Sequence, residues 1–122
     1  MTDLATLAQK AVDYNNQCRE AELLDEAYSA DIESFEAGPM PDGSAGVKGL
    51  PALKGKWEWW EGAHEIHSSK AEGPFIHGED RFGIIFEMDV TEKASGERSH
   101  MKELAIYTVS EGKIVKEEFF YT

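Results

Sequence analysis

Residues 65–122 alternate apolar and polar side chains in runs that three short turn signals separate. The signals are Gly78-Glu79, Ser95-Gly96 and Glu111-Gly112. Alternation with a period of two is typical of half-buried strands, and two-residue turns that contain glycine join antiparallel neighbours. The second half of the chain is therefore predicted to be a meander of four antiparallel strands. This restricts the fold to classes that are built on an antiparallel sheet.

The first half of the chain has a helical pattern instead. Apolar side chains recur every three or four residues at Leu4, Leu7, Ala11, Tyr14 and Cys18, and again at Leu23, Leu24, Ala27 and Tyr28. This spacing predicts a helix capped by Thr2 or Asp3, and then a second helix or kinked continuation that ends near Ser29. Residues 32–37 favour an extended segment, and residues 37–46 an exposed loop. A third helix is predicted where Leu50, Leu53, Trp57 and Trp60 share one face, with Pro51 in its first turn.

The charge balance excludes some partners. The 122 residues include 24 acidic and 12 basic side chains, and the formal net charge of -12 repels nucleic-acid phosphates and anionic lipid headgroups. The length favours a single domain over residues 1–122. Cys18 is the only cysteine, so no internal disulfide can form, and a cytoplasmic location is expected. The N-terminal sequence lacks the basic region and long apolar run of a signal peptide or membrane anchor.

Two-residue turns also fix which side chains share a face of the sheet. With Ser110 opposite Lys113 and Ala94 opposite Glu97, counting by twos gives one mainly apolar face. Its apolar members are Phe82, Ile84, Phe86, Met88, Val90, Met101, Ala105, Tyr107, Val109, Ile114 and Phe120. The same counting places Glu103 and Glu118 on this face, with Lys116, as diagonal neighbours roughly 7 Å apart. A β-bulge would undo this assignment.

Two carboxyl groups among apolar side chains are candidates for proton transfer. An unpaired buried carboxylate is costly, so its pKa rises until it finds a donor or keeps its proton. Neighbouring carboxyl groups in different environments can then act as acid and base, which makes Glu103 and Glu118 the candidate catalytic pair. The alternative is structural: the two groups pair with Lys116, Tyr107 or a histidine and satisfy one another.

The histidines supply a further candidate. His77 falls on the core face if the turn at Gly78 keeps the same parity, and His67 does so less directly. Because an imidazole titrates near neutral pH, His77 is a candidate auxiliary proton donor. The alternative is a hydrogen-bonded turn residue. His64 and His67 are three positions apart with no second ligand cluster, so neither a metal nor another cofactor is expected.

Aromatic and sulfur-containing side chains are candidates for contacts with a ligand. Trp57 and Trp60 either close the core or form an aromatic wall for a flat molecule. Phe86, Met88 and Phe120 lie on the same predicted face as Glu103. Tyr14 and Tyr107 are candidate hydrogen-bond donors to a developing oxyanion.

Three segments carry a family likeness: AYSADIESFEA, where a helix passes into a strand, then GVKGLPAL, and then the GKI turn of EGKIVKEEFFY. In this order, over nearly the whole chain, they resemble the nuclear transport factor 2 superfamily and specifically its SnoaL-like branch. The resemblance implies an α+β fold. In it, helices from the N-terminal half pack on a strongly curved, mainly antiparallel sheet that forms a cone around an internal pocket.

The resemblance also implies chemistry. Enzymes of the superfamily, such as ketosteroid isomerase, scytalone dehydratase and SnoaL-like cyclases, mostly do acid/base chemistry on small apolar substrates without metals. By resemblance, Glu36 lies at or beside the general base of the isomerase, and Tyr14 resembles its helix-borne phenol. The acidic oxyanion donor of the isomerase falls near Leu104 or Ala105, beside Glu103. The catalytic aspartate of the cyclases matches Thr122, so neither catalytic set is reproduced.

The expected function is therefore that of a pocket protein for a small, largely apolar molecule, with isomerase-, cyclase- or lyase-type proton transfer. The alternative is a non-catalytic module of the same fold that binds a ligand or another protein. A stripe on the opposite face of the sheet predicts a homodimer; its members are Ile85, Leu104, Ile106, Val115, Phe119 and Tyr121. A cavity of about 300 Å³ or more that contains both glutamates would favour the small-molecule hypothesis.

Overall fold

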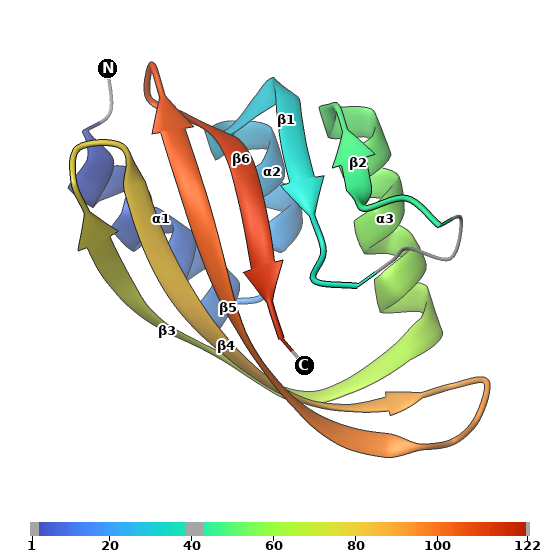
Figure 1. Cartoon of the computed structure of the whole chain (residues 1–122). Helices are drawn as coiled ribbons and strands as arrows, with labels where there is room; N and C mark the ends of the chain where they lie inside the picture. The colour runs from blue at the N-terminus through green and yellow to red at the C-terminus, as the bar shows by residue number, and fades with distance from the viewer. Residues whose placement is uncertain (1–2, 39–42, 122) are drawn as a thin grey trace.

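The computed structural model describes residues 3–38 and 43–121. Over these residues the chain forms three helices and a six-stranded sheet (Figure 1). The helices are α1 (Leu4–Asn16), α2 (Glu20–Ala27) and α3 (Leu50–Ala63). The strands are β1 (Tyr28–Phe35), β2 (Gly46–Lys48), β3 (His64–His77), β4 (Arg81–Glu92), β5 (Arg98–Ser110) and β6 (Lys113–Phe120).

The sheet is open and mixed. Its strand order is β2-β1-β6-β5-β4-β3, and the described strands pair antiparallel except for β1 and β6, which run parallel. The last four strands form the predicted meander. The predicted α+β fold, with helices from the first half of the chain on a curved and mainly antiparallel sheet, is confirmed.

Local sequence signals explain where the helices begin and end. Asp3 caps α1, because its Oδ1 accepts a hydrogen bond of 2.8 Å from the backbone N–H of Thr6; the other predicted cap, Thr2, lies outside the described residues. α2 ends at Ala27, two residues before the predicted end, and passes directly into β1. α3 begins after Gly49, whose φ of 88° suits glycine, and Pro51 lies in its first turn as expected.

The three helices cover one face of the sheet, and the other face is left uncovered (Figure 1). The core lies between these two layers, where Ile32, Phe82, Ile84, Ala105 and Ile114 are fully buried. α1 is tied to β3 by the amide side chain of Asn16, which donates a hydrogen bond to the carbonyl oxygen of Ala71 (3.0 Å) and accepts one from its N–H (2.8 Å). No helix within the described part of the chain has the length and apolarity needed to cross a membrane.

The β4–β5 pairing differs in register from the prediction but keeps the predicted faces. Thr91 lies opposite Arg98, and the turn is longer than two residues. The N–H of Gly96 closes it with a hydrogen bond of 2.8 Å to the carbonyl oxygen of Glu92. The expected pair, Ala94 and Glu97, is therefore wrong by two positions. Because side chains two apart share a face, Phe86, Met88, Met101 and Glu103 still point inward, as predicted.

The β5–β6 hairpin keeps the predicted turn but contains a bulge. Ser110 lies opposite Lys113 as predicted, and the two turn residues, Glu111 and Gly112, have φ of 52° and 76°. Beyond the turn, Val109 pairs with Ile114 and Thr108 with Lys116, which leaves Val115 as the extra residue. A bulge shifts every later side chain to the opposite face.

The bulge overturns the inward assignment of Glu118 and Phe120. Glu117 and Phe119 point inward instead, opposite Tyr107 and Ala105, and Glu117 is only 4% exposed. Glu118 lies on the outer face, where Lys116 approaches it at 3.6 Å. Phe120 also lies there and is 51% exposed. The predicted diagonal pair of Glu103 and Glu118 therefore does not form.

Candidate functional site

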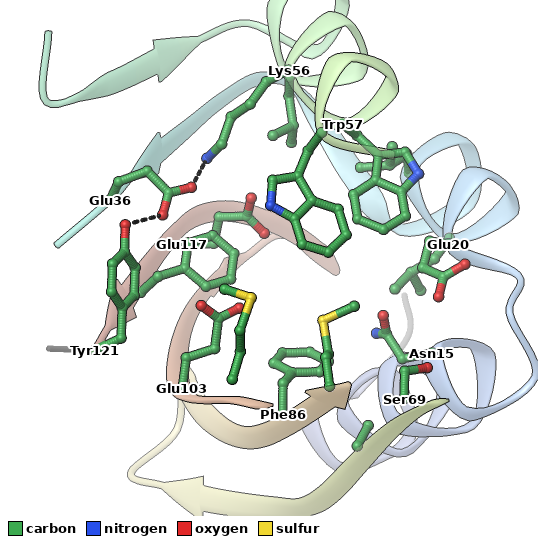
Figure 2. A pocket seen from close by; sticks show the side chains of 18 of the residues that line it. Asn15, Glu20, Glu36, Lys56, Trp57, Ser69, Phe86, Glu103, Glu117 and Tyr121 are labelled. Carbon is green, nitrogen blue, oxygen red and sulfur yellow. Dashed lines mark hydrogen bonds and ion pairs between the residues drawn. The ribbon is translucent and has the colours of Figure 1, made fainter. Parts of the chain in front are cut away.

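A cavity of about 360 Å³ lies between the helices and the inner face of the sheet (Figure 2). Its lining comes from all three helices, from β1 and from β3 to β6. The apolar part of the lining consists of Leu23, Leu24, Leu53, Trp57, Trp59, Trp60, Ala71, Phe86, Met88, Met101 and Phe119. Polar side chains gather at two places, one around Glu103 and Glu117 and the other around Glu20 (Figure 2).

The indole rings of α3 form one wall of the cavity. Trp57 and Trp60 are one helical turn apart and stack with ring centroids 5.7 Å apart and planes at 13°. The imidazole ring of His64 stacks on the indole of Trp60, with ring centroids 4.4 Å apart. The Nδ1 of His64 lies 2.9 Å from the carbonyl oxygen of Trp60. The stack fixes two large flat surfaces beside the cavity, which suits a flat apolar ligand.

Glu117 is a buried carboxylate that is held by two hydroxyl groups. The phenol of Tyr28 donates a hydrogen bond of 2.7 Å to its Oε2, and the hydroxyl of Ser34 donates one of 2.8 Å to its Oε1. Burial raises the pKa of Glu117, and these two hydrogen bonds oppose the rise. The residue is thus anchored on both oxygens, which gives it a structural role at the floor of the site.

Lys56 links this floor to a second carboxylate. Its Nζ donates a hydrogen bond of 3.0 Å to the hydroxyl oxygen of Ser34 and forms an ion pair with Glu36. Both side chains of the ion pair are largely buried. The phenol of Tyr121 donates a hydrogen bond of 3.1 Å to the other oxygen of Glu36, so one cation and one phenol hold Glu36 in place.

Glu103 differs from both of these carboxylates. It faces the cavity from β5, and no hydrogen bond or ion pair joins its carboxyl group to any of residues 3–38 and 43–121. Burial, followed by the nearby charge of Glu36, raises its pKa from 4.5 to about 7, while Lys56 partly offsets the rise. Glu103 therefore exchanges a proton near neutral pH in a mainly apolar surrounding.

Tyr107 stands four residues along β5 from Glu103, on the same inner face. Its phenol is buried, and burial together with the charges of Glu117 and Glu103 raises its pKa well above the usual value. The phenol therefore keeps its proton and can act as a hydrogen-bond donor.

The cavity brings together seven of the eleven residues that sequence reasoning proposed for the site. These are Glu36, Trp57, Trp60, Phe86, Met88, Glu103 and Tyr107. The other four, Tyr14, His77, Glu118 and Phe120, do not line it. Glu118 and Phe120 are turned outward by the bulge in β6.

Tyr14 and His77 lie outside the cavity for separate reasons. The Tyr14 ring on α1 packs under the cations of Lys10 and Arg19, which lie 5.2 and 3.9 Å from its centroid. The turn after β3 places Ile76 opposite the inward Phe82, so the side chain of His77 points to the other face of the sheet and is exposed. The predicted inward position of His77 is therefore wrong. His67 is exposed at a register shift in β3 and contacts the hydroxyl oxygen of Thr91 at 2.7 Å.

Sequence reasoning missed several residues of the cavity. Lys56 had a usable signal, because it lies three residues after Leu53 and shares the inner side of α3 with Trp57. Glu117 and Phe119 had no such signal, since the position of the bulge decides their side. Tyr121 was expected on the outer stripe together with Phe119, yet both line the cavity. Within the described residues, no three His, Cys, Asp or Glu side chains converge as metal ligands would.

The chain is similar to several known proteins. A model of the SnoaL-like domain matches residues 2–121. A solved Mesorhizobium loti protein is described both as a candidate SnoaL-like polyketide cyclase and as a carbohydrate phosphatase. It is 40% identical, with a TM-score of 0.92 over 99% of this chain and 100% of that one. No functionally curated protein matches the sequence.

More distant structures share the fold alone. A Mycobacterium tuberculosis protein in complex with estradiol-17β-hemisuccinate is 20% identical, with a TM-score of 0.75 over 99% of this chain and 95% of that one. A Δ5-3-ketosteroid isomerase from Mycobacterium sp. is 18% identical, with a TM-score of 0.72 over 100% of this chain and 95% of that one. Because the domain model matches nearly every residue and a 40% identical relative covers the same length, the chain belongs to the SnoaL-like family.

Proposed function

We propose that the protein binds a small, largely apolar molecule in this cavity and catalyses proton transfer of the isomerase, cyclase or lyase type, with Glu103 as the acid/base residue. One observation carries the proposal: a carboxyl group with a pKa of about 7 faces a mainly apolar cavity of about 360 Å³. A cavity of this size falls within the range of small-molecule sites. Of the two glutamates expected to share the cavity, Glu103 lines it, and Glu117 takes the place that was expected for Glu118.

The pKa of Glu103 suits transfer in both directions. A general base works best when its pKa lies near the working pH, because it is then partly deprotonated and still a strong enough base. In the proposed step, the Glu103 carboxylate takes a proton from a carbon next to a carbonyl group. The electron pair of the broken C–H bond forms a C=C bond, and the π electron pair of the carbonyl group moves to its oxygen. The carboxylic acid then returns the proton to the substrate at the same or a conjugated carbon.

Tyr107 is the proposed donor to the oxygen that becomes negative in this step. Its raised pKa keeps the phenol protonated, and it lines the same cavity as Glu103. A hydrogen bond to a developing oxyanion in a dry site stabilises the transition state more than the ground state. The ion pair of Lys56 and Glu36 adds a fixed dipole beside the reacting group.

The distant relatives support the class of ligand. One was solved with estradiol-17β-hemisuccinate and another is a Δ5-3-ketosteroid isomerase. The bound estradiol ester of the first and the ketosteroids named for the second are mainly apolar molecules that carry a few oxygen atoms. The walls of Trp57, Trp60, Phe86 and the two methionines Met88 and Met101 suit such a molecule here.

The test uses β-tetralone, a small bicyclic ketone, as a probe for proton abstraction. NMR in D₂O follows exchange of its α-hydrogens, and tryptophan fluorescence follows its binding beside Trp57 and Trp60. The wild-type protein should accelerate exchange, with the rate rising as Glu103 loses its proton around pH 7. Glu103→Gln should bind the probe but lose about 100-fold or more of the rate.

The matched control is Glu58→Gln, which removes an exposed carboxylate of α3 outside the cavity and should leave the exchange rate unchanged. Equal rates for wild type and Glu103→Gln would overturn the assignment of Glu103. Binding of β-tetralone without any accelerated exchange would favour the alternative function, a ligand-binding module without catalysis.

The proposal also includes a homodimer in a reducing compartment such as the cytoplasm. Phe75, Leu104 and Phe120 are 49%, 37% and 51% exposed on the uncovered face of the sheet. Apolar surface of this kind commonly marks an interface, and a twofold dimer pairs one patch with its own copy. The single cysteine, Cys18, is exposed and free, which suits a reducing environment.

A further inference from the structure

The cavity has a second polar end that the proposed chemistry does not use. Asn15, Glu20 and Ser69 line it there, and Figure 2 shows them across the cavity from Glu36, Glu103, Glu117 and Tyr121. Phe86 and Trp57 lie between the two groups. We call the group of Asn15, Glu20 and Ser69 the distal end.

Two of these three residues present hydrogen-bond acceptors to the cavity. The amide nitrogen of Asn15 is occupied, because it donates a hydrogen bond of 2.7 Å to the carbonyl oxygen of Ala11 on its own helix. Its carbonyl oxygen is left as an acceptor. Glu20 brings a carboxyl group that is half-buried, and no side chain of residues 3–38 or 43–121 pairs with it. Burial, together with the nearby charge of Glu61, raises the pKa of Glu20, and a hydrogen bond from its own backbone N–H opposes the rise.

The position of the distal end is fixed by the fold. Asn15 is the penultimate residue of α1, and Glu20 is the first residue of α2. The next residue of α1, Asn16, forms the two hydrogen bonds with the backbone of Ala71, and Ser69 lies two positions before Ala71 on the same face of β3. The contact of α1 with β3 therefore holds Asn15 near Ser69. Glu20 follows after a short turn, in which the N–H of Arg19 donates a hydrogen bond of 2.8 Å to the carbonyl oxygen of Tyr14.

The charges around the cavity restrict what can occupy this end. Lys56 is the cation buried at the Glu103 end, and it is already paired with Glu36. Lys70 also belongs to the lining, but it lies opposite Glu87 in the sheet, so its side chain has the outer parity of β3. At the distal end, a ligand group that donates a hydrogen bond would satisfy both acceptors, whereas an anionic group would face the carboxyl group of Glu20. A hydrogen bond to a charged acceptor is stronger than one between neutral groups.

We infer that the substrate carries a hydroxyl or protonated amine group at the end remote from its reacting carbon, and that Glu20 and Asn15 select this group. The inference rests on the proposed function, since it names the substrate class of the same cavity. The substrate is then a bifunctional molecule with a carbonyl group near Glu103, a flat apolar body between the two polar ends, and a hydrogen-bond donor at Glu20.

The experiment compares β-tetralone derivatives that differ only at carbon 6, across the ring system from the ketone. The 6-hydroxy compound offers a donor, the 6-methoxy compound offers only an acceptor, and the 6-carboxy compound is an anion. Binding is measured by titration calorimetry with the whole chain at mildly alkaline pH. The 6-hydroxy compound should bind about tenfold more tightly than the 6-methoxy compound, and the 6-carboxy compound should bind most weakly.

The variant Glu20→Gln should bring the ratio between the hydroxy and methoxy compounds close to one, because an amide can accept from the first and donate to the second. The control is Glu22→Gln. It removes a carboxylate from the same first turn of α2, but this one is exposed and paired with Arg19, so the ratio should stay as in wild type.

Equal affinities for the hydroxy and methoxy compounds in wild type, or an unchanged ratio in Glu20→Gln, would overturn the inference and leave the proposed function standing. If none of the tetralones binds, the proposed function fails and the inference fails with it.

Discussion

The phenol of Tyr28 donates a hydrogen bond of 2.7 Å to the buried carboxylate of Glu117, 89 positions later in the chain. The bond joins the start of β1 to the middle of β6, two neighbouring strands of the sheet. It also forms part of the cavity floor, because both residues line the cavity. The hydrogen bond therefore serves stability and the shape of the site together.

Replacing Tyr28 by Phe should lower the free energy of unfolding by about 1 to 3 kcal/mol, because a buried charged acceptor loses one donor. The pKa of Glu117 should rise further, since the Tyr28 hydrogen bond opposes the effect of burial. Urea denaturation and carboxyl NMR measure the two effects. The matched control Tyr14→Phe removes a phenol outside the cavity and should cost less than about 0.5 kcal/mol. Equal losses for the two variants would contradict the role of this hydrogen bond.

The bulge in β6 makes a prediction that separates two adjacent glutamates. Glu117→Ala leaves the hydroxyl groups of Tyr28 and Ser34 without their acceptor and should cost about 1 to 3 kcal/mol of unfolding free energy. Glu118→Ala removes a partly exposed partner of Lys116 and should cost less than about 1 kcal/mol. Denaturation of both variants checks this, and the reverse order would show that Glu118 is the inward residue.

The sequence of β6 explains why its inward face could not be predicted by counting. The strand contains two apolar pairs, Ile114-Val115 and Phe119-Phe120, so either phase of alternation places apolar side chains inside. Regular alternation from Ile114 would bury both Lys116 and Glu118. The bulge turns Ile114, Glu117 and Phe119 inward instead, so only one charged residue goes inside. The choice depends on Tyr28 and Ser34 of β1, which no local pattern in β6 reveals.

Other elements were predictable for one of two reasons. Either their sequence signals lie within one segment, or an error in the predicted turn length leaves the faces of the strands unchanged. The helical stripes and the Asp3 cap lie within single segments. On β4 and β5 the turn was misjudged by two residues, and an even error leaves the faces intact, so Glu103 was placed inward. An odd error reverses them, which is what happened to His77 across the turn before β4. The distal end with Asn15 and Glu20 was missed because it needs the packing of α1 on β3.

The uncovered face of the sheet leads to a prediction about assembly. If two copies pair there, Leu104→Lys should convert the dimer to a monomer, because it places a charge within the apolar patch of Phe75, Leu104 and Phe120. Light scattering after size-exclusion chromatography measures the mass. Lys102→Gln, at an exposed position two residues away on the same strand, is the control and should leave the mass unchanged. A wild-type protein that is monomeric at all accessible concentrations would refute the dimer.

The raised pKa of Glu103 predicts how stability depends on pH. The ordinary pKa is 4.5 and the folded protein raises it to about 7, so the folded state holds this proton more tightly than the unfolded state does. The stabilising contribution of the protonated group is therefore fully present below pH 4.5 and is lost as pH rises through about 7. The difference amounts to roughly 3 kcal/mol.

Glu103→Gln has no proton to lose, so it isolates this effect. The free energy of unfolding of the variant, relative to wild type, should increase by roughly 3 kcal/mol between acid and mildly alkaline pH. Other titrating groups are common to both proteins, and most of their contribution cancels in the difference. Urea denaturation at several pH values supplies the measurement. A difference that does not change with pH would show that Glu103 titrates normally, and the proposed acid/base role would lose its physical basis.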